Sequence, residues 1–369
     1  MTKPRQTDDF MAMKGAGYYS RATIGAKHVM DNAAGLILDA LARQPPADDG
    51  SIFTMTDMGC ADGGTSIDMV GRVLRDVRAR CPSRAIQMVY TDLPRNDFSQ
   101  LFQIVHGLTD IQSYAKGIDN LYVMASATSF HARIVPPGSL NLGHSATASH
   151  YITEVPAQIP SHVHMVGATG DVRQAFEAKG AKDWENFLLN RTSELAVGGF
   201  LALFNFGIDE EGRYLGHTGG VSMFDTFNDL WRGMLDEGLI TGAEYAATNF
   251  PQVYRTVDQF TAPLNDPSSP VYKAGLRLEH AETRVVPCPF AEAFRAGGVS
   301  AVDFARSYIP TLRSWSEPVF MAGLSGDRPA AERAALVDEF YGRYEALVAA
   351  RPDGHGMDYV HCYMICRKV

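Results

Sequence analysis

The first 206 residues alternate between short apolar runs and amphipathic helical patterns. The apolar runs predict strands at residues 52–57, 85–90, 121–127, 139–144 and 200–206. Apolar positions at helical spacing predict helices at residues 23–41, 67–77 and 183–195. Strands that alternate with helices are typical of a mainly parallel α/β sheet whose two faces are both covered.

The alternation ends after residue 207. Residues 208–277 carry helical patterns and a proline-rich segment but no clear strand. Two late strands are expected at residues 278–286 and 358–366. We therefore predict a core of residues 1–207 and 278–369, with residues 208–277 inserted as a helical cap.

Further helices are expected on both sides of this division. Within the insertion, residues 223–235 and 241–247 have helical spacing, and residues 291–308 and 332–349 have it between the two late strands. Residues 288–315 are expected to add helices to the cap. Residues 1–30 are expected to form an N-terminal lid, and the helix at residues 23–41 should end at Pro45, Pro46 and Gly50.

Three glycines follow the first predicted strand, in the stretch IFTMTDMGCADGGT at residues 52–65. Glycines let the backbone turn sharply and approach a ligand closely, and the next helix offers unpaired N–H groups at its start. A dinucleotide-binding turn would have the order G-x-G-x-x-G, whereas this turn has D-x-G-x-x-x-G with Asp57 at the strand end. A carboxylate repels phosphate but suits an ammonium group. The turn therefore favours S-adenosylmethionine (SAM) over NAD, although plain strand–helix connections also carry such glycines.

Other polar residues suggest ligand roles as well. Asp92 ends the second predicted strand, where a carboxylate can accept hydrogen bonds from both hydroxyls of a ribose, but it could equally cap the next helix. His144, His162 and His164 resemble metal ligands in type. A strand-end residue and a loop pair explain them better, so no metal is predicted.

The composition excludes several classes of function. Lys and Arg total 33 against 42 Asp and Glu, a net charge of −9 with no basic run, so a nucleic-acid partner is not expected. The start MTKPRQTDDF lacks an apolar signal segment, and no stretch of about 18 apolar residues predicts a membrane span. The five cysteines are scattered, and Cys362 and Cys366 share one face of a late strand, as expected for core residues. We therefore expect a protein of the reducing cytoplasm.

Several blocks of sequence occur together in a familiar order. TDMGCADGGT is similar to a block A-D-L-G-C-x-x-G-x-N, and TDLPRNDFSQLF is similar to N-D-L-x-x-N-D-F-N-x-x-F. The stretches MKGAGYYS, SATSFHARIVPPGSLNLGHSATASHYITEVP and NFPQVYRTVDQF also have counterparts in the same order. Over most of its length the chain resembles the plant-type salicylate, benzoate and theobromine methyltransferases, the SABATH family.

The resemblance implies a Rossmann-like class I methyltransferase sheet of seven mainly parallel strands under a helical cap, and a homodimer. It also implies SAM as methyl donor, with S-adenosylhomocysteine (SAH) as its product. Carried across by position, the implied donor-site residues are Tyr19, Thr23, Asp57, Gly59, Thr65, Asp92, Leu93, Ser129, Phe130 and Ser145. Phe130 would stack on adenine, although an ordinary core phenylalanine would fit the pattern equally.

The acceptor side departs from the plant pattern. The implied residues are Lys14, Lys27, Thr147, His150, Tyr151, Met223 and Phe224. The glutamine that grips the acceptor carboxylate in many members is replaced by Ala26 or Lys27, and the usual tryptophan is Tyr151. We expect Lys14, or else Lys27, to replace the glutamine as a cation.

The resemblance implies methylation of a carboxylate of a small organic acid to a methyl ester. A carboxylate is ionised at neutral pH and needs no general base, so alignment and exclusion of water suffice. His150 would act as a base only if the acceptor were a ring nitrogen or a phenol. An N- or O-methyltransferase of this kind is one alternative, and a catalytically silent SAM-binding homologue is another.

Overall fold

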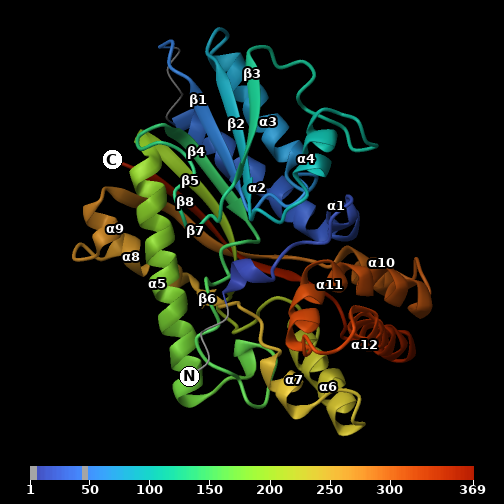
Figure 1. Cartoon of the computed structure of the whole chain (residues 1–369). Helices are drawn as coiled ribbons and strands as arrows, with labels where there is room; N and C mark the ends of the chain where they lie inside the picture. The colour runs from blue at the N-terminus through green and yellow to red at the C-terminus, as the bar shows by residue number, and fades with distance from the viewer. Residues whose placement is uncertain (1–5, 44–48) are drawn as a thin grey trace.

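The computed structural model describes residues 6–43 and 49–369, and its centre is an eight-stranded sheet (Figure 1). The strand order is β3-β2-β1-β4-β5-β8-β7, with β6 paired to β5 beside this path. Strands β1 to β5 are parallel, and β8 runs antiparallel to both β5 and β7. The strands are β1 (Phe53–Met58), β2 (Ile86–Asp92), β3 (Leu121–Ala127), β4 (Leu140–Ala146), β5 (Leu195–Ile208), β6 (Arg255–Thr256), β7 (Leu276–Val286) and β8 (Tyr359–Lys368). The expected mainly parallel α/β sheet is confirmed.

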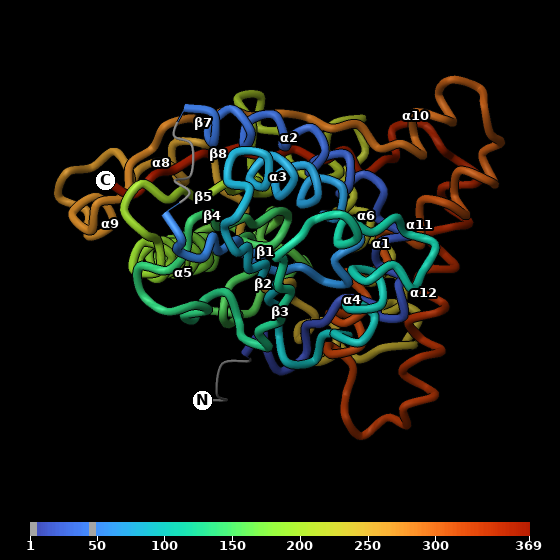
Figure 2. Tube along the Cα trace, turned by 90° about the horizontal axis from the view of Figure 1, so that it is seen from above, coloured from blue at the N-terminus to red at the C-terminus, as the bar shows by residue number. Residues whose placement is uncertain are grey.

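Two helical layers cover the sheet, and side chains of β5 alternate between them. Phe204 and Phe206 pack in the same apolar cluster as α2 (Ile24–Arg43) and α3 (Ile67–Arg80). Leu201 and Leu203 pack in a second cluster with residues of α5 (Gly170–Glu194) and α8 (Val257–Asn265). Figure 2 shows α2 and α3 on one side of the sheet and α5 on the other. The alternation follows from the two-residue period of a strand.

A helical layer lies beyond one end of the sheet, beside α1 (Figure 1). In this layer α11 packs against α1, α7, α10 and α12, and α12 packs against α6. Aromatic side chains form its centre, with Phe227, Trp315 and Phe320 among those in contact. The remaining helices are η1 (Thr7–Asp9), α1 (Tyr18–Ala22), α4 (Phe98–Val105), η2 (Met165–Gly167), α6 (Met223–Asp236), α7 (Gly242–Ala247), α9 (Pro270–Lys273), α10 (Pro289–Arg295), α11 (Ala301–Gly323) and α12 (Ala330–Ala350).

Several elements differ from the sequence-based expectation. The segment expected to be free of strands contains β6, which pairs with Gly207 and Ile208 at the end of β5. From the same segment α8 and α9 pack against β7 and α5, away from the cap helices α6 and α7. The single helix expected near 291–308 is two helices, α10 and α11, separated at Gly297 and Gly298. The expected helix end at Pro45 and Pro46 lies outside the described residues.

The cysteines are all free and buried. Cys362 and Cys366 belong to the apolar cluster on the α5 side of the sheet, as the pattern predicted. Within residues 6–43 and 49–369, no helix is both long and apolar enough to cross a lipid bilayer.

Two histidines are buried at the middle of the sheet. His144 of β4 lies against Phe204, and His361 of β8 lies 4.4 Å from Phe206 between ring centroids. Burial lowers the pKa of each imidazole to about 3, so both are neutral at pH 7. The unfolded chain takes up protons at these sites near pH 6.5, and the native state does not. These residues therefore destabilise the fold as pH falls from about 6.5 towards 3.

Replacing His361 with phenylalanine should remove one of the two side chains that take up a proton near pH 6.5 only in the unfolded chain. The difference in unfolding free energy between wild type and His361→Phe should shift by about 2 kcal/mol in favour of the variant between pH 7 and pH 5. Urea unfolding at the two pH values measures this shift. Phe206→Leu is the control, because it loses packing but no titratable group and should lower stability equally at both. An identical shift in the control would contradict the assignment.

Candidate active site

A cavity of about 660 Å³ opens at the carboxyl ends of β1, β2 and β4, where the parallel strands present their final residues. Its walls come from the N-terminal segment, the glycine turn after β1, the end of β2 and the loops after β3 and β4. The lining residues are Thr7, Asp8, Met11, Ala12, Met13, Tyr19, Gly59, Ala61, Asp92, Leu93, Ser129, Phe130, His131, Thr147, Ala148, Tyr151 and Ile152. We call it the first cavity.

A second cavity of about 370 Å³ lies beside the first. It is lined by Met13, Tyr19, Thr23, Thr147, His150, Tyr151, Phe206, Leu215, Gln252, Trp315, Met357 and Tyr359. Met13, Tyr19, Thr147 and Tyr151 line both cavities, and we call these four residues the shared wall. Two ligands bound in the two cavities would therefore meet at this wall.

The glycine turn brings backbone directly into the first cavity. Gly59 has φ of 79°, and a Cβ atom there would lie 2.6 Å from the Cβ atom of Ala148. A side chain at position 59 would therefore be excluded both by the backbone conformation and by the neighbour. The turn is closed by Asp92, whose carboxylate accepts the N–H groups of Ala61 at 2.8 Å and Leu93 at 2.7 Å. Burial raises the pKa of Asp92 to about 6, and these hydrogen bonds offset part of the rise.

Helix α1 is docked on the glycine turn. The Ser20 backbone N–H donates to the Asp62 carboxylate at 3.1 Å, and the Ser20 hydroxyl donates to the same group. The Gly64 N–H also donates to Asp62, at 3.2 Å. Sequence reasoning missed Ser20 and Asp62, because a serine in a helix and an acid in a glycine turn carry no distinctive pattern.

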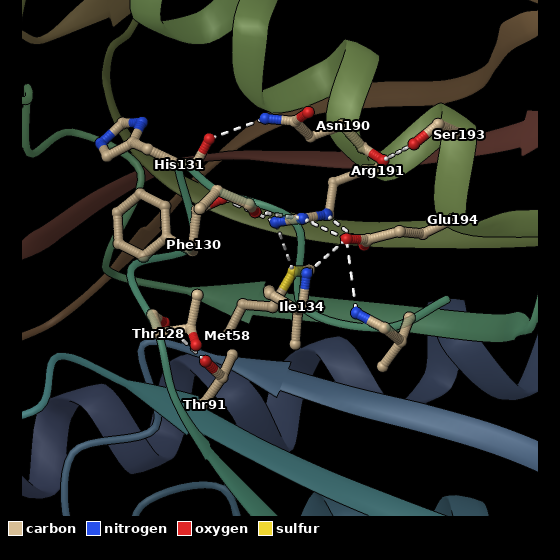
Figure 3. A network of polar contacts seen from close by, with 12 residues as sticks. Met58, Thr91, Thr128, Phe130, His131, Ile134, Asn190, Arg191, Ser193 and Glu194 are labelled. Atoms are coloured by element: carbon tan, nitrogen blue, oxygen red, sulfur yellow. Dashed lines mark hydrogen bonds and ion pairs between the residues drawn. The ribbon is translucent and has the colours of Figure 1, made fainter. Parts of the chain in front are cut away.

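The loop after β3 is held from behind by a buried ion pair of α5 (Figure 3). Arg191 and Glu194 are both fully buried and pair at 2.7 Å. Arg191 donates to the carbonyl oxygens of Phe130 and Ala132, each at 2.6 Å, and Glu194 accepts the N–H of Ile134 at 2.5 Å. The pair therefore fixes the backbone that presents the Phe130 ring to the first cavity.

Six of the predicted donor-site residues line the first cavity: Tyr19, Gly59, Asp92, Leu93, Ser129 and Phe130. The other four do not line it. Thr23 lines the second cavity, and Thr65 is buried within the glycine turn. Asp57 accepts the Ser66 hydroxyl at 2.6 Å, and Ser145 donates to the carbonyl of Met58 at 2.8 Å. Burial raises the pKa of Asp57 to about 7.

The predicted acceptor-site residues also divide. Thr147, His150 and Tyr151 line the second cavity, whereas Met223 and Phe224 do not. Met223 is buried in α6. The Phe224 ring stacks on the His164 ring, with 3.8 Å between the ring centroids. His164 and its neighbours are therefore part of the cap's packing.

Neither predicted lysine lines the first or the second cavity. The Lys14 ammonium pairs with Glu317 at 3.2 Å and lies over the Tyr18 ring. The Lys27 ammonium is held between Asp31 and Asp68, at 2.6 and 2.5 Å. Both cations are already neutralised, so the expectation that one of them grips an acceptor carboxylate is not supported by their placement.

Several lining residues were not anticipated, because they come from distant parts of the chain. The second cavity receives Gln252 from the loop before β6, Trp315 from α11, Met357 from the loop before β8, and Tyr359 from β8 itself. Backbone pairing between Tyr151 and Gln252 sets two of its polar side chains beside each other. The sequence around each of these residues looks like that around an ordinary core residue. Their common place at the cavity is therefore visible only in the folded chain.

Replacing Glu194 with glutamine should leave the buried Arg191 guanidinium without its counter-charge. We expect a loss of about 3–5 kcal/mol in the free energy of unfolding, measured by urea titration. Arg173 and Glu177 form a half-exposed ion pair at 2.6 Å on the same helix. Glu177→Gln is therefore the matched control and should cost less than about 1 kcal/mol. Equal losses in the two variants would contradict a special role for the buried pair.

Comparison with known proteins agrees with this geometry. Residues 8–323 match the family of SAM dependent carboxyl methyltransferases. Gibberellic acid methyltransferase 2 of Arabidopsis thaliana is 26% identical over 245 residues, which cover 59% of this chain and 60% of that protein. Indole-3-acetate O-methyltransferase 1 of Oryza sativa subsp. japonica is 27% identical over 252 residues, 60% of this chain and 61% of that protein. The chain thus spans about 60% of the length of these relatives.

The structure of loganic acid methyltransferase with SAH has the same fold. Its TM-score is 0.75 at 18% sequence identity, and the match covers 97% of this chain and 98% of that one. The fold is therefore that of a class I methyltransferase, as expected. With the family match over residues 8–323, the conclusion is that this chain belongs to the SABATH family of SAM-dependent carboxyl methyltransferases.

Proposed function

We propose that the protein transfers the methyl group of SAM to the carboxylate of a small organic acid. The observation that carries the proposal is the shared wall of Met13, Tyr19, Thr147 and Tyr151. A donor in the first cavity and an acceptor in the second would meet there, at the carboxyl edge of the sheet. Holding two reactants in contact and in line contributes about 7–11 kcal/mol to catalysis in favourable cases.

The first cavity fits SAM in charge and in shape. Among the described residues that line it, Asp8 and Asp92 are acidic and none is Lys or Arg. This charge suits a sulfonium and repels the pyrophosphate of a dinucleotide. Asp92 would accept hydrogen bonds from the ribose hydroxyls, Phe130 would pack on the adenine face, and Gly59 would allow close backbone approach. The cofactor, when bound, supplies the methyl group on its sulfonium.

The second cavity offers an acceptor carboxylate neutral hydrogen-bond donors in place of a cation. Burial raises the pKa of Tyr19 to about 12 and raises that of Tyr151 further, so both hydroxyls keep their protons at pH 7. The Tyr254 hydroxyl donates to Gln252 Oε1 at 3.4 Å, and the Gln252 side chain also hydrogen-bonds the Tyr151 side chain. The amide group of Gln252 and the hydroxyl of Tyr151 therefore lie together at the second cavity, where both can donate to an acceptor carboxylate. We propose that Gln252 and Tyr151 together take the place of the family's glutamine and tryptophan.

The transfer needs alignment and a dry site. A carboxylate oxygen that bonds to the methyl carbon becomes the ester oxygen, and the sulfur keeps the electron pair of the broken bond. Opposite charges are neutralised in this step, so the apolar walls from Phe206, Leu215 and Trp315 favour it by excluding water.

His150 does not support the alternative of a nitrogen or phenol acceptor. Burial lowers the pKa of its imidazole well below 6.5, and the nearby His361 and Arg255 lower it further. The side chain is therefore neutral but a weak base, which suits an orienting role more than proton abstraction. We also propose, from the resemblance, that the protein is cytoplasmic and forms a homodimer. Light scattering of the purified chain would test the homodimer.

The donor assignment predicts a specific loss of SAH affinity. Asp92→Ala should weaken SAH binding by about 1.5–3 kcal/mol in titration calorimetry, because a charged acceptor for the ribose is lost. The exposed Asp110 provides the control, and Asp110→Ala should bind SAH normally. Wild-type affinity should also fall as pH drops below about 6, where the Asp92 carboxylate takes up a proton.

The reaction is tested by incubating wild type with SAM and a panel of small carboxylic acids, followed by mass spectrometry for methyl esters. A methyl ester from at least one acid, absent with Asp92→Ala at limiting SAM, is the expected outcome. Binding of SAH without any ester would point to a catalytically silent homologue. Binding of NAD but not of SAH in titration calorimetry would contradict the proposal entirely.

The acceptor assignment predicts opposite outcomes for two variants. Gln252→Leu should lower kcat/KM for the acceptor about ten- to a hundredfold, the scale of about 1.4–2.7 kcal/mol, without changing SAH affinity. Lys14→Met should keep near-normal kcat/KM, because the Lys14 ammonium is paired with Glu317. The reverse result would restore the lysine as the carboxylate ligand.

A further inference from the structure

The N-terminal segment forms part of the wall of the first cavity. Thr7, Asp8, Met11, Ala12 and Met13 all line it. The segment is anchored at its start, where Gln6 and Glu154 pair through their backbones and the Gln6 amide donates to the Glu154 carboxylate at 2.9 Å. The Thr7 N–H also donates to the Thr153 carbonyl at 2.9 Å. These contacts fix residue 8 at the cavity on the side of the loop after β3.

Asp8 contributes a carboxylate to this wall. Within residues 6–43 and 49–369, no Lys, Arg or His forms an ion pair with Asp8. Partial burial raises the pKa of Asp8, its neighbour Asp9 raises it further, and hydrogen bonding with the Ser129 side chain offsets part of the rise. The Asp8 side chain is exposed where it lines the cavity, so its carboxylate is open to a ligand that donates a hydrogen bond to it.

Three other acceptors that line the first cavity are less suited to the amino group of adenine. Asp92 accepts two backbone N–H groups at the turn after β1 and is assigned above to the ribose. The Thr7 hydroxyl is bonded to the Ile152 carbonyl. His131 Nε2 lies 3.2 Å from the Tyr151 carbonyl, so this nitrogen carries the proton, and the bare Nδ1 is fully buried. Asp8 is the carboxylate that lines the cavity together with Ser129 and Phe130, and it hydrogen-bonds the Ser129 side chain.

We propose that Asp8 accepts a hydrogen bond from the exocyclic amino group of the adenine ring and so selects adenine over other purines. The inference rests on the proposed function, because it requires the adenine to lie on Phe130. A purine held by its face on an aromatic ring is not distinguished by that contact, since every purine has such a face. Recognition of the polar edge of the purine therefore needs a side chain that forms hydrogen bonds of the matching kind, which for an amino group is an acceptor. A carboxylate accepts from the amino group of adenine, and it finds no donor on a purine that carries hydrogen at the same position.

Titration of the full chain with SAH and with its 6-deamino analogue tests the assignment. In the analogue the adenine amino group is replaced by hydrogen, and the rest of the molecule is unchanged. Wild type should bind SAH about tenfold more tightly than the analogue, the scale of one charge-assisted hydrogen bond of about 1.4 kcal/mol. Asp8→Ala should weaken SAH about tenfold and bind both ligands within about twofold. Asp8→Asn, whose amide oxygen still accepts, should retain part of the preference.

Asp9→Ala is the matched control, because Asp9 lies in the same turn and lines neither cavity. It should keep the wild-type preference for SAH. If wild type binds SAH but does not distinguish it from the analogue, or if Asp8→Ala keeps the preference, the assignment is overturned while the proposed function stands. If wild type binds neither ligand, the proposed function itself fails.

Discussion

The sharp turn at Thr147 is the constraint on which the site depends. Thr147 has φ of 53°, a conformation that a β-branched residue rarely adopts. Its N–H donates to the Phe204 carbonyl at 2.9 Å, which holds the turn against the end of β5. Strain of this kind costs on the order of 1–3 kcal/mol and persists only where the surroundings impose it. Here it directs residues 147–151 between the two cavities.

The turn at Thr147 also explains neighbouring choices of residue. It presses Ala148 against the glycine turn, which is why position 59 has no room for a side chain. It places Thr147 and Tyr151 in the shared wall, with Tyr19 of the lid opposite them. The ion pair of Arg191 and Glu194 fixes the other side of the first cavity from behind. The first cavity is thus lined mainly by the N-terminal segment and the ends of the parallel strands, and the second also needs α11 and the loop before β6.

This division accounts for what the sequence could predict. The strands of the parallel core and the glycine turn follow from local patterns, because apolar runs and glycines at a strand end are recognised within a few residues. Asp92 is found at the first cavity as its place at the end of the second strand suggested, although the same pattern also fitted a helix cap. Gln252 and Tyr359 could not be found, because a polar residue in a loop and a tyrosine in a strand gain their roles only through convergence of distant segments. The ion pair of Lys14 with Glu317 could not be foreseen either, because the two residues are about three hundred positions apart in sequence.

The central claim is that the donor and acceptor occupy adjacent cavities and react at the shared wall. A crystal structure of the full chain with SAH tests it most directly. The account predicts adenine on Phe130 beside Asp8, ribose hydroxyls on Asp92, and the sulfur facing Tyr19, Thr147 and Tyr151. A sulfur that points away from these residues, or adenine in the second cavity, would contradict the account.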